Sequence, residues 1–196
     1  MRPKNHQEEK NNTATYRAFF AIDLPMEIKA QLAELTNNLH KLPQFKNLKW
    51  TSAENLHITL RFLGNITQKQ QKCLVTKIKS TLKTIVSFKI TMATLVPFPT
   101  AESPHVLSIK PEPTDLLLRL ALAIDHAACA CDLPADNKPF VPHLTLSRLG
   151  DNKLPRLEKI EFAQIEFPAD SVCLFKSEPE KGKSKYTLME KFPLVG

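Results

Sequence analysis

Two hydrophobic patterns share this chain, and they predict different backbones. Apolar residues recur at steps of three and four in three segments, which is the spacing of one helix face. Helices are therefore expected at 25–42, 67–85 and 114–128. Runs rich in aromatic and β-branched residues, or with every second residue apolar, predict strands. The predicted strands are 16–24, 54–63, 87–98, 105–110, 140–149, 159–167, 171–177 and 185–192.

The resulting order, β-α-β-α-β-β-α-β-β-β-β, indicates the α+β class. Alternation with interspersed hairpins predicts antiparallel or mixed sheets with helices packed outside. Thr67 followed by Gln70 predicts a capping box at the start of the second helix. Fifteen prolines against four glycines place the turns in proline-punctuated loops.

The length of 196 residues suits one domain, or two small lobes that share a core. The N-terminus is polar and lacks the apolar run of a secretory signal, so we expect residues 1–15 to be a disordered tail and 16–196 a single bilobal domain. No apolar run approaches the ~18 residues that a membrane-spanning helix needs. We therefore expect a cytoplasmic monomer with no membrane partner.

The charge balance changes the picture of possible partners. Lys and Arg number 27 against 20 Asp and Glu, which gives a net charge of +7. This excess favours polyanionic partners, nucleic acid first, although a merely basic soluble protein is the alternative.

The cysteines carry a weaker signal. Cys129 and Cys131 form a lone CxC in an alanine-rich segment, while Cys73 and Cys173 stand apart. A structural zinc site would need a second ligand pair at matching spacing. We therefore expect reduced, buried thiols and no metal.

One nine-residue pattern occurs twice. The chain reads LHITLRFLG at Leu56–Gly64 and PHLTLSRLG at Pro142–Gly150, so the two histidines are 86 positions apart (143 − 57). A single His-x-Thr in a strand is usually structural. Two copies in the same wider frame, one in each half of the chain, favour a duplicated unit that carries chemistry.

Side chains two residues apart point to the same face of a strand. His57 and Thr59 therefore share one face, as do His143 and Thr145, with apolar residues on the other. If the halves pack about a pseudo-twofold axis, two imidazoles and two hydroxyls face each other. This set suits a phosphate, because hydroxyls donate to its oxygens and two imidazoles can divide the work of acid and base near neutral pH.

With its paired motifs HITL and HLTL, the chain resembles the two-histidine phosphoesterase superfamily, and within it the RNA 2′,3′-cyclic phosphodiesterases, historically called 2′-5′ RNA ligases. RAFFAIDLP is similar to the family's opening strand and GKSKYTLMEKFPL to its closing hairpin. The resemblance implies a bilobal duplicated fold in which two antiparallel or mixed sheets line a central cleft, with helices outside and no cofactor. It also implies hydrolysis of an RNA 2′,3′-cyclic phosphate end, or of a cyclic nucleotide, to a 2′-phosphate.

The resemblance assigns roles to the matching residues. His57 would donate a proton to the departing 3′ oxygen, and His143 would be the proton acceptor that activates water. Thr59 and Thr145 would hold the phosphate oxygens. Arg148, three residues past the second threonine, matches a family arginine near the phosphate.

Arg61 is a further candidate, suggested by spacing. It follows the first motif in the alternation of His57 and Thr59, so we expect it to face the cleft and bind substrate. For Arg61 and Arg148 alike, the alternative is a solvent-facing salt-bridge partner.

The segment between the motifs departs from the family pattern. It keeps Phe98-Pro99 but has His105 and Ser108 where the family carries an arginine and a tryptophan-containing strand, which puts the substrate range in doubt. Three aromatic residues could stack on a base, with core positions as the alternative: Phe19, Phe98 and Phe140.

Two other functions stay open. RNA ligation is the same chemistry run backward, with a 5′-hydroxyl in place of water. A non-catalytic RNA-binding module would keep the phosphate site without turnover, although the presence of both histidines argues against it.

Overall fold

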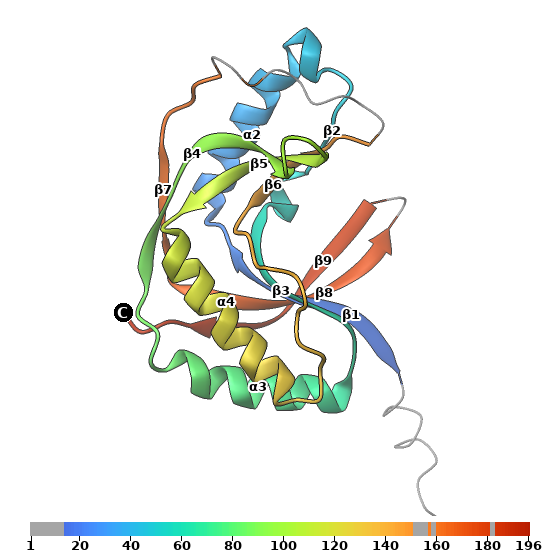
Figure 1. The fold of residues 1–196 in the computed structure, drawn as a ribbon, viewed down its shortest axis with the longest axis vertical. Helices are drawn as coiled ribbons and strands as arrows, with labels where there is room; N and C mark the ends of the chain where they lie inside the picture. Colours follow the sequence, from blue (N-terminus) through green and yellow to red (C-terminus); the bar gives the residue numbers. More distant parts are fainter. Residues whose placement is uncertain (1–13, 151–156, 158–159, 181–182) are drawn as a thin grey trace, which may run out of the picture.

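The computed structural model of the protein describes residues 14–150, 157, 160–180 and 183–196. Within them, the α-helices are α2 (Met26–His40), α3 (Gln68–Leu82) and α4 (Thr114–Cys129), and the 3₁₀ turns are η1 (Pro43–Phe45) and η2 (Ala53–Asn55). The strands are β1 (Thr15–Asp23), β2 (Lys49–Trp50), β3 (His57–Thr67), β4 (Phe88–Pro99), β5 (Pro104–Glu112), β6 (Leu144–Arg148), β7 (Ile165–Ala169), β8 (Ser171–Glu180) and β9 (Lys183–Pro193) (Figure 1).

The predicted order of elements is confirmed across the described residues. β2 is an addition, because two residues are too few to form a period in the sequence. The predicted tail falls mostly on residues 1–13, which lie outside the described part, and β1 begins at Thr15. Residue 159, predicted to open a strand, also lies outside it.

The strands form one sheet, in the order β7-β4-β5-β6-β3-β1-β8-β9, with β2 paired to β6. All of these pairings are antiparallel. The expectation of two separate sheets is therefore wrong. The halves join where β3 meets β6, through the pairing of Ile58 with Leu144. Both side chains are fully buried, so apolar packing at the junction keeps the halves in one sheet.

The helices cover this sheet with the apolar faces that the sequence predicts. In Figure 1, α3 and α4 pack together against the lower half of the sheet, and α2 lies near β2 at the top. Thr67 Oγ1 accepts a hydrogen bond from Gln70 N at 3.2 Å, and Gln70 Oε1 accepts one from Thr67 N at 3.0 Å, so the capping box of α3 is confirmed. Over the described part of the chain, every helix is too short or too polar to cross a membrane.

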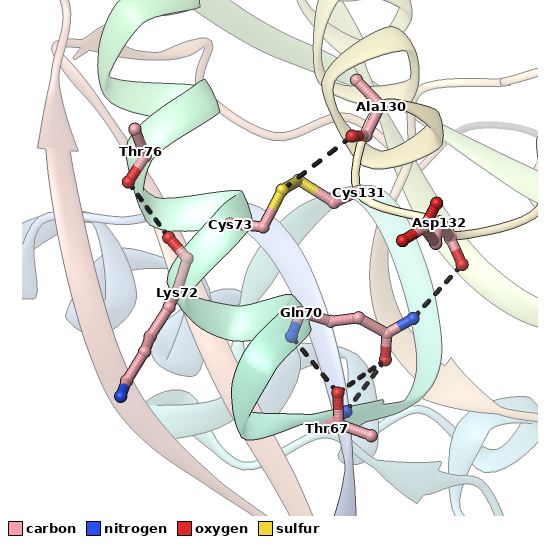
Figure 2. Close-up of a disulfide and its surroundings, with 8 residues drawn as sticks. All are labelled: Thr67, Gln70, Lys72, Cys73, Thr76, Ala130, Cys131 and Asp132. Carbon is pink, nitrogen blue, oxygen red and sulfur yellow. Dashed lines mark hydrogen bonds between the residues drawn. A yellow bond between two sulfur atoms is a disulfide. The ribbon is translucent and has the colours of Figure 1, made fainter. Parts of the chain in front are cut away.

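A disulfide joins α3 to the turn that follows α4, and it contradicts the expected reduced thiols. Cys73 and Cys131 are bonded with a Cα–Cα distance of 5.7 Å (Figure 2). They are 58 residues apart, and only the packing of α3 against α4 brings them together, so no local spacing announces the pair. The neighbouring Cys129 is free and exposed, and Cys173 is free and buried.

Candidate active site

The first motif begins at the first residue of β3. His57 Nδ1 lies 2.7 Å from the carbonyl oxygen of Asn55, at the end of η2. A carbonyl only accepts, so Nδ1 carries the hydrogen and Nε2 of the neutral ring is the free base. Nε2 lies 2.9 Å from Thr59 Oγ1, whose hydroxyl donates to it. The turn before β3 therefore selects the tautomer.

The second motif repeats this arrangement one residue before β6. His143 Nδ1 lies 2.8 Å from the carbonyl oxygen of Val141, again two residues earlier in the chain. The Nε2 of His143 is therefore also the free base of its neutral ring. The ring of Phe98, from β4, stacks on this imidazole with the ring centroids 3.7 Å apart and the planes at 19°.

The β3–β6 pairing brings the two motifs side by side. With Ile58 paired to Leu144, antiparallel register sets each histidine opposite the threonine of the other motif. Such diagonal neighbours lie roughly 7–8 Å apart, a span that one phosphate can bridge between His57 and His143. The paired residues are buried, so the flanking side chains share the other side of the strands. We call this side the motif face, and it carries His57, Thr59, His143 and Thr145.

A β-bulge follows each motif and breaks the alternation. In β3, Thr59 pairs with Ala21 but Arg61 pairs with Phe20, so the register shifts by one residue. Phe20 belongs to the core beneath the helices, and Arg61 points to that side with it. The expectation that Arg61 shares a face with Thr59 is therefore wrong. Phe62, which pairs with Phe19, takes the place on the motif face.

The bonds of Arg61 show what it does instead. Its Nε donates to Asp125 Oδ1 of α4 at 2.6 Å, and Nη1 donates to Asp136 Oδ2 at 3.2 Å. Its Nη2 donates to the carbonyl of Pro134. The guanidinium is mostly buried and holds the loop that leads from α4 to His143. Arg61 therefore supports the second motif rather than facing a ligand.

In β6 the same shift has the opposite outcome for an arginine. Thr145 pairs with Ser108 and Arg148 pairs with Val106, across a register shift. Since Val106 and Ser108 are two residues apart on β5, Arg148 returns to the motif face. Arg148 is exposed there, at the position that Phe62 takes in the other half.

Aromatic rings surround His57 on the motif face. The ring centroid of Phe19 is 4.9 Å from that of His57, and Tyr186 of β9 meets the imidazole edge-on at 5.3 Å. Phe62 extends this group at 5.9 Å from Phe19 and is 60% exposed. Sequence analysis missed Phe62 because it assumed unbroken alternation past the motif.

Burial lowers the pKa of both histidines below the ordinary 6.5. At His57 the Asn55 carbonyl and the Asp23 carboxylate oppose this effect, while His143 and Lys29 add to it. At His143 a backbone carbonyl opposes burial. Both rings therefore favour the neutral form at pH 7, with Nε2 ready to accept a proton.

Comparison with known proteins decides the family. A model described as LigT like phosphoesterase matches residues 22–108 and again 107–186, one motif in each match. The chain belongs to this phosphoesterase family. The double match agrees with the duplicated motif, and it confirms the resemblance to two-histidine phosphoesterases.

Relatives within the LigT-like family cover most of the chain. An RNA 2′,3′-cyclic phosphodiesterase of Thermus thermophilus is 30% identical over 186 residues, 92% of this chain and 91% of the relative. One of Thermotoga maritima is 29% identical over 164 residues, covering 82% and 86%. The crystal structure of E. coli LigT complexed with 3′-AMP superposes with a TM-score of 0.79 at 26% identity, over 93% of this chain and 100% of that one.

The other sequence candidates of this LigT-like chain take different places. Ser108 is buried and donates to the Val96 carbonyl at 3.2 Å, and His105 is exposed at the start of β5. Phe140 is half-buried against the core, which is the alternative that the sequence left open. Among the described residues, no group of three or more His, Cys, Asp and Glu could hold a metal.

Proposed function

We propose that this protein hydrolyses the 2′,3′-cyclic phosphate end of RNA, or a cyclic nucleotide, to a 2′-phosphate. One observation carries the proposal: the β3–β6 register aligns both His-x-Thr motifs on one face, with each Nδ1 occupied by a backbone carbonyl. Two imidazoles that each present Nε2 to the same space suit a displacement at phosphorus. The relatives named as RNA 2′,3′-cyclic phosphodiesterases support the same chemistry.

In the proposed reaction, water attacks phosphorus opposite the 3′ oxygen. His143 Nε2 takes a proton from the water as the new P–O bond forms. The P–O3′ bond breaks, and protonated His57 donates its Nε2 proton to the 3′ oxygen, which leaves a 3′-hydroxyl and a 2′-phosphate. This order of donor and acceptor follows the family resemblance, because the two motifs have the same backbone geometry.

The remaining groups of the motif face would bind the phosphate. Thr59 and Thr145 would donate hydroxyl hydrogens to the non-bridging oxygens, and Arg148 would offset their negative charge. The bulge that returns Arg148 to this face supports its part in the site. Arg61 is left out, because its donors bind Asp125, Asp136 and backbone carbonyls.

The aromatic group beside His57 offers a surface for the nucleobase. Phe62 is well exposed and lies next to Phe19, so a base attached to the bound phosphate could stack on it. Stacking of this kind tolerates any base, which fits an enzyme that acts on RNA ends of varied sequence. The net charge of +7 favours approach of the polyanion.

Incubation with a short RNA ending in a 2′,3′-cyclic phosphate tests the proposal. The product should carry a 2′-phosphate and a 3′-hydroxyl, and His57→Ala or His143→Ala should each lower kcat by roughly 10²–10⁴-fold. His126→Ala, in the exposed histidine of α4, is the matched control and should leave kcat unchanged. A 3′-phosphate product, or near-normal turnover in either motif variant, would contradict the assignment.

The two alternatives are separated in the same assay. Adding an RNA with a 5′-hydroxyl would reveal a 2′-5′ linked product if ligation competes with hydrolysis. Retention of the RNA without any new terminus would identify a binding module. Hydrolysis is favoured because water reaches the motif face at a far higher concentration than any 5′-hydroxyl.

A further inference from the structure

An ion pair lies at the end of β1, next to the first motif. Asp23 is the cross-strand partner of His57, so the two side chains stand on the same face of the sheet. Asp23 Oδ1 is 2.7 Å from Lys29 Nζ of α2, and it also accepts a hydrogen bond from Leu24 N at 3.0 Å. The proposed reaction uses neither member of this pair.

The burial of Lys29 calls for a reason. Its side chain is only 8% exposed, on the face of α2 that also buries Ile28 and Leu32. Burying an ammonium costs desolvation free energy that an apolar side chain at the same position would not. A lysine here therefore indicates a polar task that packing alone does not require.

The contacts of Lys29 lead to the orientation of His57. Lys29 Nζ donates to the carbonyl of Glu54 at 3.4 Å. The next carbonyl in the chain, that of Asn55, accepts the hydrogen of His57 Nδ1 at 2.7 Å. Lys29 thus joins three parts of the site: the carboxylate at the end of β1, the η2 turn, and the ring that the turn orients.

We propose that the Asp23–Lys29 pair positions His57, by fixing the η2 turn whose Asn55 carbonyl orients the imidazole and by placing a carboxylate beside that ring. The inference rests on the proposed function, since it assigns the pair to the histidine that donates the proton. Asp23 and Lys29 are positioning residues, because they act through His57 and not on the substrate.

The charges of the pair act on His57 in opposite directions. The Asp23 carboxylate favours the imidazolium and raises the pKa of His57, whereas the Lys29 ammonium lowers it. While both are present the two effects offset each other, and removal of either leaves the other unbalanced. The titratable and charged groups near the ring and the pair are Asp23 of β1, Lys29 of α2, His143 ahead of β6, Tyr186 of β9, and Cys173 of β8, whose pKa burial raises to about 11.

The second histidine has a different support. His143 lies under the ring of Phe98, and the influences on its pKa are burial and the Val141 carbonyl. The two motifs therefore share the bond from Nδ1 to a carbonyl and differ in what lies beside the ring. This difference predicts that changes to the Asp23–Lys29 pair alter the titration of one histidine and leave the other almost unchanged.

Titration of the histidines by NMR, in protein labelled at the imidazole rings, tests the inference. Asp23→Asn should lower the pKa of His57 and Lys29→Met should raise it, each by roughly half to one pH unit, while the pKa of His143 moves less. The double variant should return close to the wild-type value. The matched control is the Lys89–Glu166 pair, 2.9 Å apart between β4 and β7, where Lys89→Met and Glu166→Gln should leave both histidines unchanged.

Kinetics supply the second readout. Each single variant should lower kcat several-fold with little change in KM, and the alkaline limb of kcat/KM should move with the pKa of His57. Lys29→Arg, which keeps the charge and the donors, should preserve both. Asp23 is 38% exposed and asparagine still accepts from Leu24 N, so Asp23→Asn carries the test even if Lys29→Met does not fold.

An unmoved His57 titration in Asp23→Asn, with normal kcat, would overturn the inference and leave the pair a structural tie between β1 and α2. Failure of the proposed function looks different. In that case His57→Ala keeps its activity, or the cyclic phosphate is not hydrolysed at all, while the NMR titration still reports the effect of the pair on the ring.

Discussion

Removal of the Cys73–Cys131 disulfide is a perturbation whose size follows from the chain itself. The bond closes a loop with a sequence separation of 58. In the chain-entropy treatment, a loop of this length stabilises the folded state by about 4 kcal/mol at 25 °C. For a protein of this size each kcal/mol corresponds to roughly 2–4 °C in Tm, so the expected loss is roughly 8–16 °C.

Thermal unfolding of Cys73→Ser, Cys131→Ser and the double variant measures this loss. All three should unfold at a similar, lower temperature, because either substitution opens the same loop. A reductant should bring the wild type down to the same level and leave the double variant unchanged. Cys129→Ser is the matched control, since Cys129 is two residues from Cys131 but is free and exposed.

Thiol counting checks the premise of the same experiment. The unfolded oxidised protein should react at two cysteines, Cys129 and Cys173, and the reduced protein at all four. Four reactive thiols without reductant, or one Tm with and without it, would refute the reasoning. The expected cytoplasmic location stays a prediction, and in a reducing compartment the open form would be the working state. We expect that form to remain active, because Arg61 holds the loop before His143 through bonds of its own.

Further outcomes concern the motif face. Because burial lowers the pKa of both histidines, the window of kcat/KM should lie on the acid side of 6.5. Activity should fall as pH rises through the pKa of His57, which must be protonated to donate, and as pH falls through that of His143, which must be neutral to accept. Phe98→Ala removes a stacking contact worth about 0.5–1.5 kcal/mol and should lower kcat several-fold with KM nearly unchanged. Activity should survive EDTA, because imidazoles supply the acid and the base; complete loss restored by zinc would contradict the mechanism. Arg148→Ala should raise KM and lower kcat, whereas Arg61→Ala should lower Tm more than kcat/KM.

Local rules suffice for much of this fold. Helix faces repeat every three to four residues, so the buried positions of α3 and α4 can be predicted without any knowledge of the partner strands. The Thr67 capping box is equally local, because both of its hydrogen bonds join residues three apart. The strands that bear the motifs follow from their apolar alternation. These features depend on neighbours in the chain and are therefore visible in one sequence.

Features that depend on contacts distant in the chain are not visible in this way. The disulfide requires α3 to pack against α4, and the merger of both halves into one sheet requires the pairing of Ile58 with Leu144. The Asp23–Lys29 pair joins the end of a strand to the first turns of a helix, six residues later. Each feature arises from tertiary packing, about which local periodicity carries no information.

The error over Arg61 has a different origin, because the bulge behind it does leave a local mark. Buried apolar residues run Ile58, Leu60, Leu63 in one half and Leu144, Leu146, Leu149 in the other, a step of two followed by a step of three. An unbroken strand cannot bury such a series on one face, so the longer step marks an inserted residue. With that insertion counted, the fifth residue after each histidine belongs on the motif face. The duplicated backbone thus presents an aromatic ring from one half and a guanidinium from the other, one suited to a base and one to a phosphate.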